Sequence, residues 1–375
     1  MSGTGNGRRR RVVLVGGGHA HALVLLDYAR RPLEDTEVLL VAGEMAAPYS
    51  GMLPGLVAGR FTHDECHIDL PKLALAAGAT AIAGRVVAVD HKAGLATLAD
   101  GRVERFDVIS IDVGITPDLG GIEGAEAHGI AVKPISSFFP KWQALTARAE
   151  AEDLPSLAII GGGAAGFELA LAARETLGAR VEIDLVAGGR LMAGLGARVG
   201  RLGRAALKRN AITLIEQDRA AAVTPDGVVL ASGTRLDAAA VMVTTGAQPA
   251  PWFAASGLPL SPAGYLAARP TLQLTGCDTV LAAGDCVDVL AHPRPKAGVI
   301  AVRQGPPLAE NIRRLVRGEP ALPFAPQRRW LQLLTSGPGT AIAAWGGIAV
   351  ETRWALAWKD RIDRAFMHAF ETVSR

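Results

Sequence analysis

Short apolar runs recur along this chain, and the clearest of them end in glycine-rich turns. Residues 12–15 and 157–160 are apolar runs of four, and each precedes three consecutive glycines and a segment that can begin a helix. A short apolar run bounded by turn residues is typical of a strand buried on both faces. The pattern predicts parallel sheets with right-handed crossovers and helices on both faces.

The second glycine turn has the complete spacing G-x-G-x-x-G at Gly161, Gly163 and Gly166. Glycines at these positions permit the tight turn and let the backbone approach a pyrophosphate. The N-terminus of the following helix adds unpaired N–H groups and the positive end of the helix dipole. The turn therefore predicts a dinucleotide site, with Glu168 two residues beyond the last glycine.

The first glycine turn is incomplete. Gly16 and Gly18 are present, but His21 stands where the third glycine belongs. One interpretation is that His21 occupies a looser contact between the helix and the strand. The alternative is that His19 or His21 donates to a phosphate or lies near a flavin.

The strand that follows each turn lacks the acid that would hold an adenosine ribose. Ala42 stands at the expected position of this acid after residues 38–41, and the first acid, Glu44, comes two residues later. After residues 184–186 comes Ala187. The sequence therefore favours neither NAD nor NADP.

Three further strand ends complete the pattern. An apolar run at residues 279–283 ends in Gly284 and Asp285, and the carboxylate there can accept hydrogen bonds from a sugar-alcohol chain. Gly114 and Gly246 each open a Gly-x-x-Pro tetrapeptide, which breaks a strand at a cofactor edge. The same plan thus occurs twice. We expect a protein that holds two dinucleotides and passes electrons between them.

With these motifs the chain resembles the flavin-dependent pyridine nucleotide-disulfide oxidoreductase superfamily, over residues 10–325. In that superfamily the first turn and the Gly-Asp strand bind FAD, and the second turn binds NAD(P)H. Within it the chain is most similar to type II NADH dehydrogenase-like flavoproteins. Residues 48–55, 66–70 and 359–364 resemble the branch associated with selenophosphate synthetase (selenide, water dikinase), although the 375 residues contain no counterpart of the synthetase domain.

The resemblance implies an α/β fold with two Rossmann-like dinucleotide-binding domains. The FAD-binding domain would comprise residues 1–132 and 266–325, with the NAD(P)H-binding domain inserted as residues 133–265. A small C-terminal α/β segment would follow at residues 326–375. The strands expected in the inserted domain are 157–160, 181–186, 212–216, 228–231 and 241–244.

The resemblance also implies a set of site residues, with FAD and NAD(P)H as cofactors. Glu168 would lie near the nicotinamide, and Tyr49 and Lys133 near the flavin. His67 is a candidate proton donor to the flavin or to the acceptor, and the alternative is a surface or helix-capping histidine. The expected cofactor-binding positions are Gly16, Gly18, His19, His21, Gly114, Gly161, Gly163, Gly166, Gly246, Gly284, Asp285 and Gln304.

Composition and charge narrow the class of protein. Hydrophobic residues make up 49% of the chain and charged residues 20%, as in globular proteins. A net charge of +3 gives no reason to expect a nucleic-acid partner. No uninterrupted apolar run reaches the about eighteen residues that a spanning helix needs. We expect a cytoplasmic protein, either soluble or held peripherally at the inner face of a membrane.

Three cysteines, Cys66, Cys277 and Cys286, have no close C-x-x-C or C-x-x-x-x-C spacing. Disulfide-reducing relatives carry such a pair, so a dithiol relay is not expected. Buried free thiols are the default for cysteine, and a redox pair of Cys277 and Cys286 is the alternative. His63 and His67 beside Cys66 suit zinc, but no second ligand pair lies elsewhere at the required spacing, so no metal is expected.

A stripe near the C-terminus bears on the protein's partners. Trp354, Trp358, Ile362, Phe366 and Phe370 recur every four residues, which predicts a broad apolar face on a helix. One interpretation is an interfacial helix on an anionic bilayer, as a quinone reductase requires. We favour a helix that closes the protein's own core or a homodimer interface, because nearby acids dilute the positive charge.

The electron acceptor is the least determined feature. Quinone-reducing relatives carry a glutamine-bearing A-Q-x-A-x-Q helix start after the Gly-Asp strand. Gln304 matches the second glutamine, whereas Ile300 stands at the first. A quinone is therefore one candidate acceptor for an FAD-dependent NAD(P)H oxidoreductase. The alternative function is a flavin-binding redox partner or sensor with slow turnover in selenium metabolism.

Overall fold

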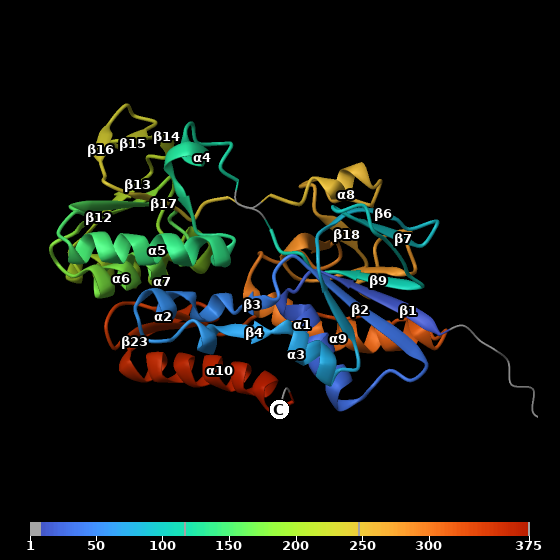
Figure 1. Ribbon diagram of the computed structural model, residues 1–375. Coiled ribbons are helices and arrows are strands. Elements are labelled where there is room, and N and C mark those ends of the chain that lie inside the picture. The colour runs from blue at the N-terminus through green and yellow to red at the C-terminus, as the bar shows by residue number, and fades with distance from the viewer. Residues whose placement is uncertain (1–8, 116–117, 247, 374–375) are drawn as a thin grey trace, which may run out of the picture.

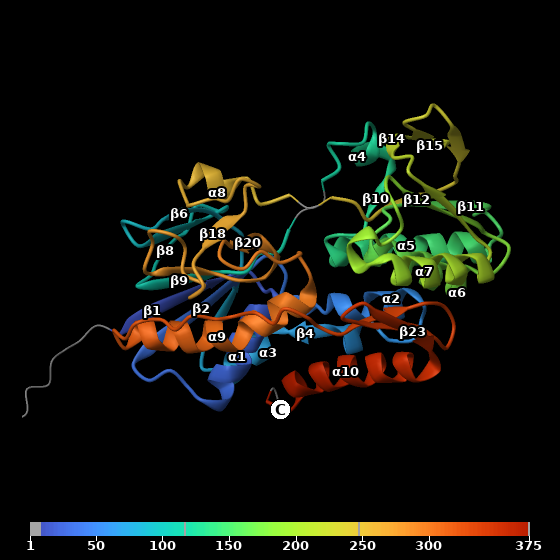
Figure 2. The same ribbon diagram turned by 180° about the vertical axis from the view of Figure 1, so that it is seen from behind.

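The computed structural model describes residues 9–115, 118–246 and 248–373 (Figure 1, Figure 2). It contains two five-stranded parallel sheets, each with a glycine turn after its central strand. The first sheet has the strand order β19-β9-β1-β2-β5. Its strands are β1 (Arg10–Val15), β2 (Thr36–Ala42), β5 (Thr80–Ala83), β9 (Val108–Ile111) and β19 (Val280–Ala282).

The two faces of the first sheet are covered differently, which corrects the expectation of helices on both faces. Val12 and Leu14 pack with helices, whereas Val13 and Val15 belong to a separate apolar cluster, because successive side chains of a strand alternate between faces. The helical face holds α1 (His19–Arg30), α3 (Leu70–Ala76) and α9 (Gly298–Val316). The other face holds β6 (Val86–Asp90), β7 (Leu95–Leu98), β8 (Val103–Arg105), α8 (Trp252–Ala255), β18 (Leu266–Ala268) and β20 (Val287–Val289).

The second sheet repeats this arrangement, with the strand order β10-β17-β11-β12-β13. Its strands are β10 (Ile130–Ala131), β11 (Ser156–Ile160), β12 (Glu182–Ala187), β13 (Ile212–Glu216) and β17 (Val241–Val243). In Figure 1, helices α5 (Ile135–Glu150), α6 (Ala164–Leu177) and α7 (Ala197–Arg209) cover one face. The other face carries α4 (Ala125–His128), β14 (Ala220–Thr224), β15 (Gly227–Leu230) and β16 (Arg235–Asp237).

Four of the five strands expected in the inserted domain match strands of the second sheet to within one residue. The fifth, expected at residues 228–231, is β15 and belongs to the antiparallel sheet. Local apolarity predicts a strand in each case, but it carries no information on which sheet the strand joins.

Two elements near the expected domain boundaries belong to the opposite unit. Strand β10 precedes the expected boundary at residue 133, yet it pairs with β17 of the second sheet. Helix α8 precedes the expected boundary at residue 266, yet its Phe253 packs in the core of the first unit. We propose that the first crossing precedes β10 and that the second lies between β17 and α8. Thr116, Pro117 and Ala247 of the Gly-x-x-Pro tetrapeptides lie outside the described residues.

The C-terminal segment is an antiparallel sheet followed by a helix. Its elements are β21 (Gln332–Thr335), β22 (Ala341–Trp345), β23 (Ile348–Thr352) and α10 (Arg353–Glu371). Helix α10 packs against the first unit, where β3 (Ala46–Pro48), α2 (Leu53–Val57) and β4 (His67–Asp69) lie, and the small sheet packs on α6 and α7 of the second (Figure 1). The segment therefore bridges both units. None of the described helices is long and apolar enough to cross a membrane.

The apolar stripe on α10 does not stay on one side of the helix. Trp354, Trp358 and Ile362 are 52%, 44% and 42% exposed, whereas Phe370 is 4% exposed. An α-helix has 3.6 residues per turn, so positions four apart rotate by about 40° at each step. The stripe thus turns from solvent into the core. The residues that α10 buries are Ala355, Leu356, Lys359, Asp363, Met367 and Phe370.

Candidate active site with two dinucleotide cradles

A groove of about 580 Å³ runs along the carboxyl ends of the first sheet. Open parallel sheets bind their ligands at this edge. The glycine turn after β1, the end of β9 and the start of α9 form its wall. Six residues singled out from the sequence meet there, namely Gly16, Gly18, His19, Gly114, Lys133 and Asp285.

The first glycine turn is held by His21 in place of a third glycine. His21 is fully buried, with Nδ1 2.7 Å from the carbonyl oxygen of Gly16 and Nε2 2.8 Å from Oγ of Ser110. Burial lowers the pKa of His21 to about 4, so the ring is neutral and donates one bond while accepting the other. Both nitrogens are engaged within the fold. Of the two interpretations of His21, the contact between the helix and the strand fits this geometry, which gives no support to a bond from His21 to a phosphate or a flavin.

His19, the first residue of α1, faces the groove. Its ring meets the Tyr49 ring edge-on, with the centroids 5.4 Å apart. Burial lowers the pKa of His19 to about 4, against the attraction of Asp285. Its Nε2 atom is buried and has no hydrogen-bond partner among the described residues. A buried nitrogen without a partner fits a polar group of a bound cofactor, because such groups are rarely left unpaired.

Asp112, which the sequence did not point to, belongs to the same cradle. Its Oδ2 accepts hydrogen bonds from the N–H groups of Ala20, at 2.9 Å, and His21, at 3.1 Å. A β-carbon on Gly18 or Gly284 would lie within 2.3 Å of this carboxyl group, so both positions require glycine. Burial raises the pKa of Asp112 to about 7. In the sequence, the feature that could have identified Asp112 is its position two residues before Gly114 of the first Gly-x-x-Pro tetrapeptide.

Asp285 and Lys133 close the groove opposite the glycine turn. Lys133 Nζ lies 3.4 Å from Asp285 Oδ2, which joins the end of β19 to the segment before α5. Gln304 lies behind them, and its Oε1 accepts a hydrogen bond from the N–H of Gly284 at 2.7 Å. Gln304 therefore positions the Gly-Asp turn and does not line the groove as a quinone contact would.

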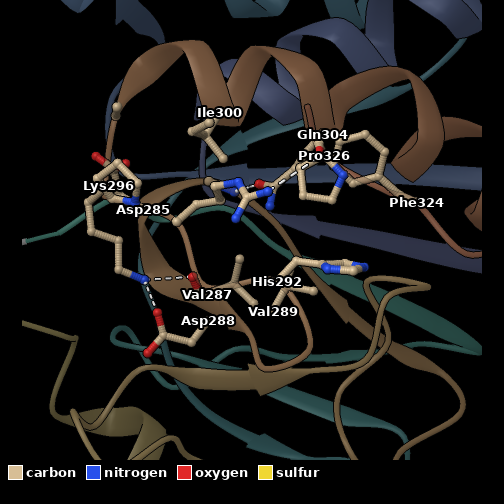
Figure 3. A pocket seen from close by; sticks show the side chains of 14 residues that line it. Asp285, Val287, Asp288, Val289, His292, Lys296, Ile300, Gln304, Phe324 and Pro326 are labelled. Atoms are coloured by element: carbon tan, nitrogen blue, oxygen red, sulfur yellow. Dashed lines mark hydrogen bonds and ion pairs between the residues drawn. The ribbon is translucent and has the colours of Figure 1, made fainter. Parts of the chain in front are cut away.

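A small cavity of about 20 Å³ lies behind the Gly-Asp turn (Figure 3). Lys296 is engaged there, since its Nζ donates to the carbonyl oxygen of Val287 at 2.6 Å and pairs with Asp288 at 2.7 Å. The same Nζ lies 3.9 Å from the centroid of the Tyr265 ring. With Lys296 so occupied, Lys133 is the lysine that lines the groove beside Asp285.

The second glycine turn borders a pocket of about 340 Å³ at the end of β12. Gly161 has φ of +134°, and a β-carbon there would lie 2.1 Å from Thr244 Oγ1. A β-carbon on Gly166 would lie 1.9 Å from the carbonyl oxygen of Gly161. Gly163, by contrast, has no atom within 4 Å of its β-carbon position. That open side is where a pyrophosphate approaches the backbone. Gly246, with φ of +70°, ends the neighbouring strand.

Glu168 does not line the pocket of the second glycine turn. It lies on α6 and accepts a hydrogen bond from the N–H of Thr335, at 2.8 Å, on the C-terminal segment. Loss of solvent raises the pKa of Glu168, while the charge of Lys359 works in the opposite direction. The structure therefore places Glu168 between the second unit and α10.

A buried ion pair on α10 was also missed from the sequence. Lys359 Nζ donates to Asp363 Oδ2 at 2.8 Å and to the carbonyl oxygen of Gly51 at 2.7 Å. Burial works against the charge of Lys359, but Glu168 and Asp363 keep its pKa above the usual value. Burial also raises the pKa of Tyr49, whose hydroxyl bonds to Asp363. The four-residue spacing of Lys359 and Asp363 on a predicted helix was the available signal.

His67 lies on β4 and does not line the groove. Its ring stacks on that of His63, with the centroids 3.8 Å apart, and its Nδ1 lies 2.6 Å from the carbonyl oxygen of His63. Burial lowers the pKa of His67. This position gives no support to a proton donor at the flavin. Over the described residues, no group of three or more candidate ligands could hold a metal ion.

Cys66, Cys277 and Cys286 are free and buried. Burial raises the pKa of each thiol, to about 12 for Cys66. A thiol with a raised pKa is a poor nucleophile, because the thiolate is the reactive form. The three cysteines therefore have the default role of apolar core residues.

Comparisons with known proteins agree with this geometry. Residues 10–305 match the family described as pyridine nucleotide-disulphide oxidoreductase. The chain is 25% identical over 347 residues to demethylphylloquinone reductase NdbB of Synechocystis sp., which covers 88% of this chain and 86% of that protein.

Two solved structures share the fold. The sulfide:quinone oxidoreductase of Aquifex aeolicus has a TM-score of 0.81 at 18% identity, over 97% of this chain and 92% of the other. NDH2 of Plasmodium falciparum in complex with NADH has a TM-score of 0.80 at 13% identity, over 97% and 98% of the two chains. The family match spans both glycine turns and the Gly-Asp strand. The chain therefore belongs to the pyridine nucleotide-disulphide oxidoreductase family, as an FAD enzyme that uses NAD(P)H.

Proposed function

We propose that this enzyme reduces a quinone at a membrane surface, by the overall reaction NAD(P)H + H⁺ + quinone → NAD(P)⁺ + quinol. FAD, when bound, supplies the electron transfer between the two substrates, and the protein binds and orients the reacting groups. The two electrons come from NAD(P)H as a hydride, and the second hydrogen of the quinol comes from a proton.

The first cradle would hold FAD and the second would hold NAD(P)H. Asp285 would accept hydrogen bonds from the polar chain of FAD, with Lys133 beside it in the groove. The unpartnered Nε2 of His19 would supply a further hydrogen bond. Gly163 would leave room for the pyrophosphate of NAD(P)H.

The proton that the reaction consumes needs a group to hold it. We assign that role to Glu168, whose Oε1 accepts a hydrogen bond from the N–H of Thr335 at 2.8 Å and which interacts with the charge of Lys359. Lys359 and the hydrogen-bonded pair of Tyr49 and Asp363 lie beside it and order this part of the site. His67 has no part in this assignment, since its ring is turned to His63.

The observation that carries the quinone proposal is an exposed apolar surface on the C-terminal segment. Among the described residues, twelve large hydrophobic side chains are exposed, and six of these lie between residues 345 and 362. A concentration of exposed apolar side chains marks an interaction site. The six residues, which we name the C-terminal apolar surface, are Trp345, Ile348, Val350, Trp354, Trp358 and Ile362.

Strand register places the strand residues of this surface on the side that carries α10. Trp345 pairs with Ile348, and Ala343 pairs with Val350. Paired residues of antiparallel strands point to the same face. Ala343 packs in a cluster with Ala355 of α10, so this is the face that α10 covers. The strand residues therefore lie on the α10 side of the sheet.

Arginines accompany the apolar surface. Arg353 and Arg361 are exposed on α10. Arg328 and Arg329 border a groove of about 510 Å³ together with Trp345. None of these four arginines forms a salt bridge with another described residue. Exposed aromatic and aliphatic side chains with free arginines suit an anionic lipid surface.

The acids of α10 do not cancel this charge. Asp360 is paired with Arg60 at 3.6 Å, and Asp363 is buried with Lys359. We expected the nearby acids to dilute the positive charge of the helix, but these two are paired with cations. The similarity to a demethylphylloquinone reductase and to a sulfide:quinone oxidoreductase supports a quinone as acceptor.

Vesicle sedimentation tests the membrane part of the proposal. Trp354→Ser combined with Trp358→Ser should reduce binding to phosphatidylglycerol vesicles at least fivefold, while NAD(P)H:dye activity stays unchanged. Leu75→Ser is the control, because Leu75 is 78% exposed but lies on α3, outside the surface. Binding of the wild type that is equally weak to phosphatidylglycerol and phosphatidylcholine vesicles would contradict the proposal.

An acceptor screen tests the chemistry. Anaerobic turnover with NAD(P)H should be fastest with a quinone incorporated in vesicles, and slower with disulfides, oxygen, a ferredoxin or selenium compounds. A selenium compound that turned over faster than every quinone would favour the alternative role in selenium metabolism. Slow turnover with all acceptors, despite rapid flavin reduction, would favour a redox partner or sensor.

A further inference from the structure

The end of β12 lacks the carboxylate that holds an NAD ribose. The strand leads into Gly188, Gly189 and Arg190, and all three line the pocket of the second glycine turn. A carboxylate at this position accepts a hydrogen bond from the ribose 2′-hydroxyl in NAD-binding sites. Here Ala187 and the two glycines offer no such acceptor.

The nearest carboxylate, at the end of the neighbouring strand β13, is already occupied. Glu216 accepts two hydrogen bonds from Arg204, at 2.6 and 2.7 Å, and a third from the N–H of Leu191, at 2.5 Å. Asp218, two residues further on, accepts from the backbone N–H of Ser232 at 3.1 Å and from its hydroxyl at 2.5 Å. These bonds hold both carboxylates within the fold and away from a ribose hydroxyl.

Two arginines flank the place where the acid would stand. Arg190 lines the pocket, and a β-carbon on Gly188 would lie 2.9 Å from Cβ of Arg219, so the Arg219 side chain starts beside the same loop. Both arginines are exposed. Neither side chain forms a hydrogen bond or a salt bridge with another described residue, and the charge of Arg190 contributes to lowering the pKa of Glu216. Unpaired guanidinium groups are suited to bidentate recognition of phosphate.

We propose that NADPH is the preferred electron donor and that Arg190 and Arg219 bind its 2′-phosphate. The inference rests on the proposed function, since it names the substrate of the second cradle. A phosphate adds a charge of about −1.5 to −2 at this position, which the two arginines attract, while the carboxylate of Glu216 is paired with Arg204.

Nucleotide fragments test this subsite without turnover. The FAD-loaded enzyme should bind 2′,5′-ADP at least tenfold more tightly than 5′-AMP in a calorimetric titration. Arg190→Ala and Arg219→Ala should each remove most of that difference and leave the affinity for 5′-AMP within twofold. Arg235→Ala is the control, because Arg235 is exposed on β16 of the same unit and does not line the pocket.

Anaerobic flavin reduction provides the second measurement. NADPH should exceed NADH in kcat/KM by at least tenfold, and each arginine variant should lower the value for NADPH alone by at least tenfold. Gly189→Glu should move the preference toward NADH, since Gly189 has no atom within 4 Å of its β-carbon position and the added carboxylate would repel phosphate.

Each outcome separates this inference from the proposed function. A preference for NADH, or a ratio that neither arginine variant changes, would overturn the NADPH assignment and leave the oxidoreductase proposal in place. A flavin that neither nucleotide reduces would overturn the proposed function itself. Melting temperatures of the variants close to that of the wild type ensure that a lost preference is not a lost fold.

Discussion

The two glycine turns satisfy the same geometric requirement with different residues. In the second turn Gly166 comes so close to the first glycine that a β-carbon would lie 1.9 Å from the carbonyl oxygen of Gly161. In the first turn the imidazole of His21 reaches the corresponding carbonyl oxygen, that of Gly16, at 2.7 Å. In the second turn the backbone of Gly166 packs directly against this carbonyl oxygen. In the first turn the His21 side chain forms a hydrogen bond to it.

The residues that contact each turn from the neighbouring strand also differ, with a small hydroxyl group at the second turn and a carboxylate and a hydroxyl group at the first. Thr244 packs its small hydroxyl group against the second turn. In the first turn Asp112 accepts from the start of α1, and Ser110 bonds to His21. A third glycine is therefore required only where the helix must touch the strand directly. A buried, neutral histidine with two partners replaces it where a wider gap has to be filled.

The largest effect is expected from a substitution in the second glycine turn, which should prevent flavin reduction by NAD(P)H without affecting FAD binding. Gly163→Val should fold normally, because no atom lies within 4 Å of the β-carbon position, but the side chain would fill the space that a pyrophosphate needs. We expect NAD(P)H-driven flavin reduction to fall at least a hundredfold, with flavin absorbance unchanged. Dithionite should still reduce the flavin, and an equal loss of FAD would mean that the two turns were assigned to the wrong cofactors.

The converse change affects the first cradle. Asp285→Ala removes a carboxylate from the FAD groove, and we expect FAD to bind at least tenfold more weakly, because the polar chain of the cofactor loses an acceptor. Equilibrium dialysis of the flavin measures this affinity. Binding of 5′-AMP to the second cradle should stay within twofold, and a parallel loss there would argue against two independent sites.

A third change tests whether His21 is a structural replacement for glycine. His21→Gly restores the G-x-G-x-x-G spacing but removes two buried hydrogen bonds and leaves a cavity, at a cost of about 2–4 kcal/mol in unfolding free energy. Denaturant unfolding of the FAD-loaded protein measures the loss. Unchanged or increased stability would show that the histidine is incidental.

The pH dependence of the unfolding free energy tests whether His21 is neutral and Asp112 protonated in the folded protein. The pKa of His21 is lowered to about 4 from 6.5, so the unfolded chain takes up a proton first and stability falls as pH decreases from 6.5 to 4. The pKa of Asp112 is raised to about 7 from 3.8, so its contribution falls as pH increases from 3.8 to 7. The slopes have opposite signs and about 1.4 kcal/mol per pH unit each.

Unfolding curves of two variants between pH 4 and pH 7 resolve these slopes. His21→Gln should make the loss of stability on acidification shallower than in the wild type. Asp112→Asn should make it steeper, because the opposing contribution is removed. Identical slopes in all three proteins would mean that neither group changes its protonation on unfolding.

The smallest effect is expected at the thiols, which neither cradle uses. Replacing Cys66, Cys277 and Cys286 together by serine should leave NAD(P)H:quinone activity within about threefold, because buried thiols with raised pKa values are unreactive. Flavin content and melting temperature have to be measured in parallel, since a buried hydroxyl costs stability. A well-folded, fully loaded single variant with a hundredfold loss of turnover would reveal cysteine chemistry.

Local patterns account for what the sequence predicted well. The apolar runs and glycine spacings identify β1, β11 and their turns, since each signal lies within about ten neighbouring residues. The covering of each sheet by an antiparallel sheet was missed, because it depends on which distant strands meet. The stripe on α10 was read at a period of four, and the true period of 3.6 turns Phe370 inward while Trp354 stays exposed.

The site residues that were missed are brought together from distant segments. Lys359 and Asp363 meet Gly51 and Tyr49, which come from the other end of the chain. His67 was a candidate proton donor through the resemblance, with a surface or helix-capping histidine as the alternative, and its position gives no support to the first. Its pairing on β4 turns the ring to His63 instead. Contacts between segments that are distant in the sequence cannot be predicted from the local pattern of residues.

The split layout of the first sheet sets an order for synthesis on the ribosome. The strands of the second sheet lie between residues 130 and 243, whereas β19 and the Gly-Asp turn follow only at residues 280–285. Domains fold as units once their segments have emerged. A nascent chain halted before residue 280 would therefore carry every strand of the second sheet but neither β19 nor Asp285. The groove to which we assign FAD is thereby completed only after the whole second sheet has been synthesised.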